Sequence, residues 1–244
     1  MTSVKSKKSK SSVVSLKGVE FRWPGKAGFG LAVDELEVGR GERILLLGPS
    51  GSGKSTLLNL LCGIVVPDTG QITLLDQDIA AMSASARDRF RAEHLGIIFQ
   101  MFNLLPYANA VENVLLPLGF APDRCDRAGR NNSAKEEAVR LLSELGIDGA
   151  LSTYTQASHM SIGQQQRVAA ARALIGEPAI IVADEPTSAL DDDAQERFLD
   201  LVLRQLDVLG STLLMVSHDQ RIAGRFDRTV RMDEFARPLE SVLA

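Results

Sequence analysis

A glycine-rich segment that follows an apolar run constrains the fold more than any other part of this chain. Residues 48–55 meet the spacing G-x-x-x-x-G-K-S in full, after the apolar residues 44–47 and before the helix-compatible residues 57–61. The segment and the threonine after it consist of Gly48, Pro49, Ser50, Gly51, Ser52, Gly53, Lys54, Ser55 and Thr56. A buried strand that enters such a turn and leaves it as a helix is typical of a phosphate-binding loop. An ordinary Gly/Ser-rich loop is the alternative.

The residue types of this loop predict how it holds a nucleotide. Its glycines let successive backbone N–H groups point into one concavity, and the N-terminus of the following helix adds partial positive charge there. Lys54 is expected to reach the β- and γ-phosphates, and the Ser55 hydroxyl to coordinate Mg²⁺. The segment therefore predicts a nucleotide phosphate site.

Composition disfavours several other classes of protein. The chain has 244 residues, 45% of them hydrophobic, so it can form a substantial hydrophobic core. This length fits one large domain, or a main domain with a smaller lobe. A net charge of −4 argues against a broad nucleic-acid surface. Cys62 and Cys125 lie in contexts that do not suggest a disulfide, which fits a reducing cytosol. No apolar run approaches the roughly 20 residues of a membrane span, and no signal-peptide core is present.

The N-terminal residues differ in character from the rest of the chain. Residues 1–12 carry four lysines among serines, which predicts a disordered basic tail; weak contact with an anionic membrane surface is the alternative. Residues 13–244 are expected to form the folded domain.

Apolar strands alternate with helix-compatible segments along that domain, which predicts an α/β fold with a parallel sheet. Residues 13–23 alternate apolar and polar side chains up to the turn at Pro24, and they are interpreted as an edge-type strand. Residues 101–160 are interpreted as a helical lobe, with helices at 111–118 and 133–145 separated by polar breaks.

Polar side chains follow three of the predicted strands. They are Gln100 after residues 95–99, Asp184 and Glu185 after residues 179–183, and His218 after residues 212–216. Such strand ends meet at the crevice where α/β folds bind ligands. Asp184 is expected to hold Mg²⁺ through a water, Glu185 to polarise the attacking water, and the Gln100 amide oxygen to contact either. A lone histidine such as His218 is more often a surface or core residue, but this convergence favours a role in the site.

Two further segments are specific to one family. Residues 160–167 are Met-Ser-Ile-Gly-Gln-Gln-Gln-Arg, and residues 188–191 are Ser-Ala-Leu-Asp. Together with the phosphate loop and the strand-end residues, in this order, they resemble the ATP-binding cassette (ABC) ATPases over about residues 13–225. The resemblance implies a P-loop NTPase fold with a RecA-like parallel sheet core, an antiparallel β subdomain and an inserted α-helical subdomain at about residues 101–160.

The same resemblance implies how ATP and Mg²⁺ are bound. Ser161, Gly163 and Gln164 would contact the γ-phosphate held by the opposite subunit of a head-to-tail homodimer, with two ATP molecules between the subunits. Asp191 would carry contacts across that interface, and Trp23 resembles the aromatic residue that stacks on adenine. Lys54, Gln100, Glu185 and His218 are then the catalytic residues, and Ser55, Gln100 and Asp184 the metal-binding ones.

Two positions depart from the family pattern. The signature segment usually has two glycines after its serine, and here the first of them is Ile162. Trp23 occupies a position where tyrosine is common; its larger π-face can still stack on a base, and a core role for Trp23 is the alternative.

A smaller segment resembles one subgroup of the family. Residues 102–106, Phe-Asn-Leu-Leu-Pro, and 112–118, Glu-Asn-Val-Leu-Leu-Pro-Leu, are similar to the exporter cassettes that serve lipoprotein release, macrolide efflux and cell-division permeases. The resemblance implies an ATPase subunit on the cytoplasmic face of the inner or plasma membrane. It would drive a separately encoded, FtsX-like integral membrane permease that exports lipid, lipoprotein, macrolide-like or envelope components, and it would have no nucleic-acid partner.

Three other proteins that use such a cassette are the alternatives. A soluble ATPase of iron–sulfur assembly also has one cassette, and the exporter-like segments argue against it. A DNA-repair or chromosome-organising ATPase needs a long heptad insertion, for which the interval between residues 99 and 161 is too short. A translation factor needs a second cassette.

Overall fold

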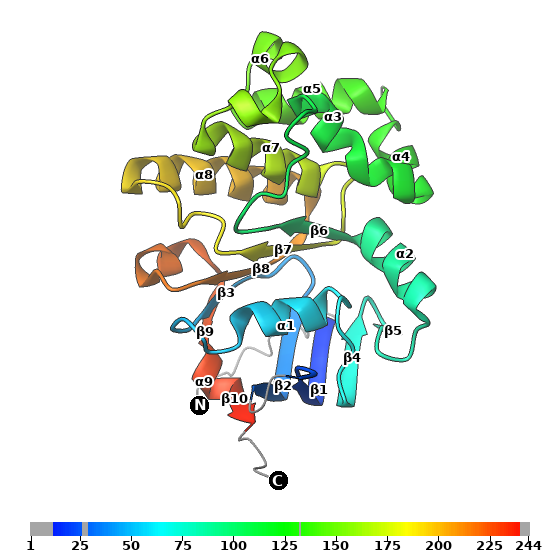
Figure 1. Cartoon of the computed structure of the whole chain (residues 1–244), viewed down its shortest axis with the longest axis vertical. Coiled ribbons are helices and arrows are strands. Elements are labelled where there is room, and N and C mark those ends of the chain that lie inside the picture. Colours follow the sequence, from blue (N-terminus) through cyan, green and yellow to red (C-terminus); the bar gives the residue numbers. More distant parts are fainter. Residues whose placement is uncertain (1–11, 26–28, 132, 240–244) are drawn as a thin grey trace, which may run out of the picture.

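Two β-sheets face each other across one helix (Figure 1). The computed structural model describes residues 12–25, 29–131 and 133–239. One sheet is wholly parallel. In order across it, its strands are β6 (Leu95–Ile98), β7 (Ile180–Asp184), β8 (Thr212–Ser217), β3 (Arg43–Leu47) and β9 (Arg228–Arg231). The predicted parallel core is thus confirmed.

The second sheet is antiparallel and packs on the other side of that helix. Its strands, in order, are β10 (Ala236–Leu239), β2 (Gly30–Gly39), β1 (Ser12–Arg22), β4 (Thr69–Leu74) and β5 (Gln77–Asp78). Ser12, assigned from the sequence to the basic tail, is the first residue of β1; residues 1–11 of that tail lie outside the described residues.

The prediction that residues 13–23 form an edge strand is wrong. β1 lies in the interior of its sheet and is hydrogen-bonded to both β2 and β4. Val14 and Leu16 are buried on one face of β1, while Lys17 and Glu20 are exposed. Alternation of this kind reports one solvated face, which an interior strand of an antiparallel sheet has as well.

The helix between the sheets is α1 (Lys54–Leu61), which follows the phosphate loop (Figure 1). Its buried leucines, Leu57 and Leu60 among them, pack with Ile44 of β3 on one side and with Leu16 of β1 on the other. The burial of this apolar face holds the loop at a fixed place between the two sheets.

The opposite face of the parallel sheet is covered by α7 (Ile162–Leu174) and α8 (Asp192–Leu209). A Cβ atom on Gly96 of β6 would lie 2.1 Å from the carbonyl oxygen of Ala173, so only glycine lets α7 pack this closely on the strand. The core further includes α2 (Ala84–His94), the 3₁₀ helix at Gln220–Arg225, and α9 (Met232–Phe235).

The helical lobe lies beyond α7 and α8, on the side away from the sheets (Figure 1). Its helices are α3 (Ala110–Leu115), the 3₁₀ helix Leu116–Phe120, α4 (Pro122–Ala128), α5 (Ala134–Glu144), α6 (Gly149–Tyr154) and the 3₁₀ helix Ala157–His159. The helices predicted at 111–118 and 133–145 are present, whereas α4 and α6 were not predicted. In the parts of the chain that the structure describes, no helix is both long and apolar enough to cross a membrane.

Two buried charged residues, Glu93 and Arg124, fix the start of the polar helix α4 and join the lobe to the core. Arg124 is 2% exposed, and its guanidinium donates to the carbonyl oxygens of Ile175 and Ala173, both at 2.8 Å, and of Leu95 at 2.9 Å. The buried Glu93 carboxylate accepts the backbone N–H groups of Asp123 and Arg124 at the start of α4. Burial lowers the pKa of Arg124 to about 10, which leaves it charged at neutral pH.

Replacing this arginine tests its role in joining lobe and core. Arg124→Ala leaves several buried carbonyl groups without donors, so we expect the free energy of unfolding to fall by about 3 kcal/mol or more. Urea denaturation followed by circular dichroism measures this. The control is Arg130→Ala, which removes an exposed ion pair with Glu177 at 3.6 Å and is expected to cost less than about 1 kcal/mol. Equal losses in the two variants would contradict this account of the lobe.

Candidate functional site

The parallel sheet brings the sequence-predicted strand-end residues to one edge. Leu47 pairs with Ser217, Asp184 with Val216, and Ile98 with Ala183, so β3, β8, β7 and β6 end at nearly the same level. The phosphate loop, His218 and Glu185 follow β3, β8 and β7 directly, and Gln100 follows β6 after Phe99. A cavity of about 280 Å³ opens there, lined by Phe29, Ser50, Gly51, Gly53, Lys54, Ser55, Thr56, Gln100, Asp184 and Glu185.

Glycines give the loop its path. Gly51 and Gly53 have φ values of 81° and 93°, in the left-handed region that favours glycine, and Gly53 is the residue that caps α1. Gly48 has no room for a side chain, since a Cβ atom there would lie 2.6 Å from Ser52 Oγ. Gly48, Pro49 and Ser52 shape the loop without lining the cavity. The first backbone N–H groups of α1 remain available to an anion at this end of the helix.

The side chain of Lys54 lies in the concavity of the loop. Its Nζ donates to the carbonyl oxygens of Gly48 at 2.7 Å and Pro49 at 3.0 Å, and lies 3.3 Å from Glu185 Oε1. The Lys54 side chain is 7% exposed and that of Glu185 15%. A positive charge is thus held, largely out of water, beside backbone donors, which is the arrangement that binds polyphosphate.

Oxygen donors for a small cation lie next to the loop. Ser55 Oγ donates to Asp184 Oδ2 at 3.2 Å, and Gln100 lines the same cavity. Burial raises the pKa of Asp184, and the neighbouring Glu185 charge adds to the rise, while the Ser55 hydrogen bond and Lys54 oppose it. The Ser55 hydroxyl, the Asp184 carboxylate and the Gln100 amide are oxygen ligands that fit Mg²⁺. This ion binds few protein ligands and completes its coordination shell with phosphate and water.

Glu185 is placed between a lysine and a histidine. Its φ is 42°, a left-handed value that is unusual for a residue with a side chain, and its backbone N–H donates to the Val216 carbonyl at 3.1 Å. Glu185 Oε2 lies 3.1 Å from His218 Nδ1. A carboxylate fixed on both sides at the edge of a phosphate pocket can accept a hydrogen bond from an attacking water and orient it.

Two aromatic side chains lie beside the loop. Trp23 Nε1 donates to Thr56 Oγ1 at 3.1 Å, and the Trp23 ring meets Phe21 edge to face, with centroids 5.1 Å apart. Phe29 lines the cavity, and sequence reasoning missed it. The backbone places it there, because the Trp23 N–H donates to the Phe29 carbonyl at 3.2 Å, and the sequence pattern carries no signal for this pairing.

The signature residues lie outside the cavity within a single chain. Ser161 caps α7, its hydroxyl accepting the Gln164 N–H while the Gln164 side chain accepts the Ser161 N–H. The Asp191 carboxylate caps α8 by accepting the N–H of Ala194 at 2.8 Å. None of these residues, nor Gly163, lines the cavity. The structure thus brings the loop and the strand ends together but leaves the signature apart.

The fold and the site define a P-loop NTPase: a phosphate loop between β3 and α1, facing a carboxylate pair at the end of β7. A family model described as ABC transporter matches residues 31–188. A lipoprotein-releasing system ATP-binding protein, LolD of Syntrophotalea carbinolica, is 40% identical over 198 residues, which are 81% of this chain and 84% of that protein. The macrolide export ATP-binding/permease protein MacB of Rhodopirellula baltica is 39% identical over 199 residues, 82% of this chain but 28% of that longer protein.

A solved structure agrees in shape. The dimeric, post-hydrolysis state of the ATP-binding cassette MJ0796, bound to ADP and Pi, has a TM-score of 0.74 and 31% identity, and the match covers 89% of this chain and 93% of that one. The chain belongs to the ABC transporter family, and it is an ATP-binding subunit that hydrolyses ATP. The predicted family, fold class and ATPase activity are confirmed.

The raised pKa of Asp184 gives the ligand-free protein a pH dependence. The folded carboxyl group holds its proton more tightly than the unfolded chain does, so ionisation above its ordinary pKa of 3.8 lowers the free energy of unfolding. Asp184→Asn removes this titration and keeps an oxygen for Ser55. We expect the variant to be at least as stable as the wild type, by an amount that grows from about pH 4 upward.

Urea denaturation at several pH values, without nucleotide, measures the difference. Added ATP with Mg²⁺ should stabilise the wild type more than ATP with EDTA does, and this Mg²⁺-dependent part should be lost in Asp184→Asn. If the variant is less stable than the wild type without ligand at pH 7, the assignment of a raised pKa to Asp184 is contradicted.

Proposed function

We propose that this chain is the nucleotide-binding subunit of an exporter and drives a separately encoded membrane permease. Two copies would close head to tail around two ATP molecules with Mg²⁺, and hydrolysis would reopen them. The observation that carries the proposal is an open groove between core and helical lobe that begins beside Gln100, where an ATPase could contact a second protein without covering its nucleotide.

In this proposal each site residue has one task in hydrolysis. Lys54 and the loop amides bind the β- and γ-phosphates and stabilise the charge that develops as the terminal phosphoryl group transfers. Ser55, Asp184 and Gln100 hold Mg²⁺, which neutralises phosphate charge when bound. Glu185 orients the attacking water, and His218, hydrogen-bonded to Glu185, keeps that carboxylate in register.

The signature residues support the second copy. Ser161 and Gly163 begin α7, whose N-terminus suits a phosphate, yet they lie outside the cavity of their own chain. Ile162 between them is 54% exposed, on the surface where the proposal places the second subunit. The MJ0796 cassette is dimeric, which agrees with this arrangement. Trp23, with Phe29 at the cavity, is proposed to receive the adenine.

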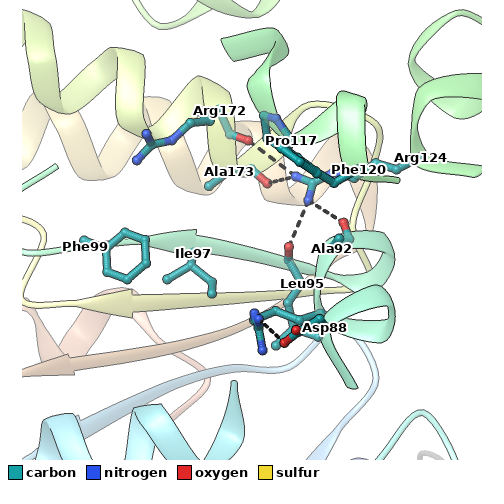
Figure 2. Close-up of a pocket in the computed structure, with 11 residues that line it drawn as sticks. Asp88, Ala92, Leu95, Ile97, Phe99, Pro117, Phe120, Arg124, Arg172 and Ala173 are labelled. Carbon is teal, nitrogen blue, oxygen red and sulfur yellow. Dashed lines mark hydrogen bonds and ion pairs between the residues drawn. The ribbon is translucent and has the colours of Figure 1, made fainter. Parts of the chain in front are cut away.

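The groove supports a permease partner. It has a volume of about 390 Å³ and lies between α2, the end of β6 and the 3₁₀ helix Leu116–Phe120 of the lobe (Figure 2). Phe99 and Pro117 line it, and Phe120 is 71% exposed at its border. Asp88 and Arg91 add a charged pair on α2, 2.6 Å apart. An apolar cleft with a charged side suits a short amphipathic helix, and we assign it to a cytoplasmic helix of the permease.

The exported substrate class rests on similarity. LolD is named for lipoprotein release and MacB for macrolide export. We therefore propose lipid, lipoprotein, macrolide-like or envelope components as the cargo of an FtsX-like permease. The chain would then lie at the cytoplasmic face of the inner or plasma membrane, held there by the permease.

Extraction of the tagged chain from its native cells with mild detergent, followed by mass spectrometry, tests this proposal. We expect an integral membrane protein in stoichiometric amount. Phe120→Asp places a charge in the groove and should lose that protein while the purified chain still hydrolyses ATP. The matched control is Tyr154→Asp, which changes an 85% exposed aromatic residue outside the groove. This variant should still retain the membrane protein. Soluble proteins alone, or retention of the partner by Phe120→Asp, would contradict the proposal.

A further inference from the structure

The turn that carries Gln100 has an unfavourable backbone. The Phe102 N–H donates to the Phe99 carbonyl at 3.1 Å, so Gln100 and Met101 are the central residues of a turn that directly follows β6. The next two residues, Phe102 and Asn103, have φ values of 58° and 49°. Two consecutive residues with side chains in the left-handed region persist only where their surroundings hold them.

One buried arginine supplies the contacts that hold these residues. Arg172, in the last turn of α7, is 8% exposed. Its Nη1 donates to the Asn103 carbonyl at 2.6 Å, and its Nη2 donates to the Phe102 carbonyl. Figure 2 shows the Arg172 guanidinium on the side of the groove where Phe99 lies, whereas Arg124 reaches Leu95 and Ala92 at the other end. Arg172 therefore binds the carbonyl groups of both left-handed residues, Phe102 and Asn103, at the same time.

The buried charge of Arg172 is compensated by the carbonyl groups of the turn. Burial lowers the pKa of its guanidinium, so the charge is kept in a poorly solvated place where only good acceptors compensate it. A guanidinium can bind two carbonyl oxygens with a fixed angle between them, which a lysine ammonium cannot do. The geometry of the acceptors, and with it the path of residues 99–103, is set by this planar group.

We propose that Arg172 is a positioning residue for ATP hydrolysis, which holds the turn 99–103 so that Gln100 stays at the nucleotide cavity. The inference rests on the role proposed above for Gln100. It also connects two parts of the site, because the signature serine, Ser161, caps the start of α7 and Arg172 lies in the last turn of the same helix. A shift of α7 would thereby move residues 102 and 103, which follow Gln100 closely in the chain.

Steady-state ATP hydrolysis by purified Arg172→Gln at a series of Mg²⁺ concentrations tests the proposal. We expect kcat to fall by about 10- to 100-fold and the half-saturating Mg²⁺ concentration to rise, as for loss of a residue that orients a metal ligand. Arg172→Lys keeps the charge but not the planar fork and should recover part of the activity. Arg140→Gln, an arginine on the outer surface of α5 that pairs with Glu137, is the matched control and should behave as the wild type.

A double mutant separates positioning from a general structural role. If Arg172 acts through Gln100, then Gln100→Ala combined with Arg172→Gln should be no slower than the slower single variant. Multiplicative losses, or an unchanged Mg²⁺ dependence in Arg172→Gln, would overturn the inference. Should Arg172→Gln not fold, Arg172→Lys carries the same comparison.

The single variants also distinguish the two proposals. If Gln100→Ala hydrolyses ATP as the wild type does, the role assigned to Gln100 is wrong and the inference about Arg172 falls with it. If Gln100→Ala is impaired and Arg172→Gln is not, only the inference about Arg172 is wrong.

Discussion

The site depends on one electrostatic arrangement, a nearly buried lysine held in a turn of backbone opposite a carboxylate. Lys54 donates to two loop carbonyls and lies 3.3 Å from Glu185. This pairing depends on the position of α1, which is fixed between the two sheets. It also depends on the strand order, in which only β8 separates β7, which ends before Glu185, from β3, which leads into the loop. In the proposed function, a bound phosphate would compete with these partners for Lys54, and Glu185 would then be available to orient a water. The proposal therefore links phosphate binding to the state of the carboxylate through Lys54.

Two buried arginines join the helical lobe to this core at different points. Arg124 binds carbonyls of α2, β6 and α7 and fixes the base of the lobe, while Arg172 binds the turn that follows Gln100. Both line the groove assigned to the permease (Figure 2). A helix seated in that groove would therefore touch the two contacts that set the position of the lobe and of Gln100. We infer that the coupling between partner and nucleotide runs through this short region.

The sequence predicts well what depends on local pattern and poorly what depends on packing. The G-x-x-x-x-G-K-S spacing and the apolar runs before Gln100, Asp184 and His218 place the loop and the strand ends correctly, since parallel strands share one carboxyl edge. The place of β1 was predicted wrongly because alternation reports a solvated face and not an edge. The helix α4 depends on Glu93 and Arg124, contacts that join distant segments. The place of Phe29 depends on its backbone hydrogen bond with Trp23. No local rule contains these facts.

In the proposed assembly one working site needs two copies of the chain, and mixing two defective variants tests this most directly. Lys54→Ala removes the phosphate-binding lysine. Gly163→Asp places a negative charge at the start of α7, where a Cβ atom meets nothing nearer than Leu190 at 3.9 Å, so the chain should fold. Each variant alone should be inactive. An equimolar mixture should regain ATP hydrolysis, because an intact loop of one copy then faces an intact signature of the other. A mixture as inactive as its parts, or a fully active Gly163→Asp variant, would contradict the two-copy site.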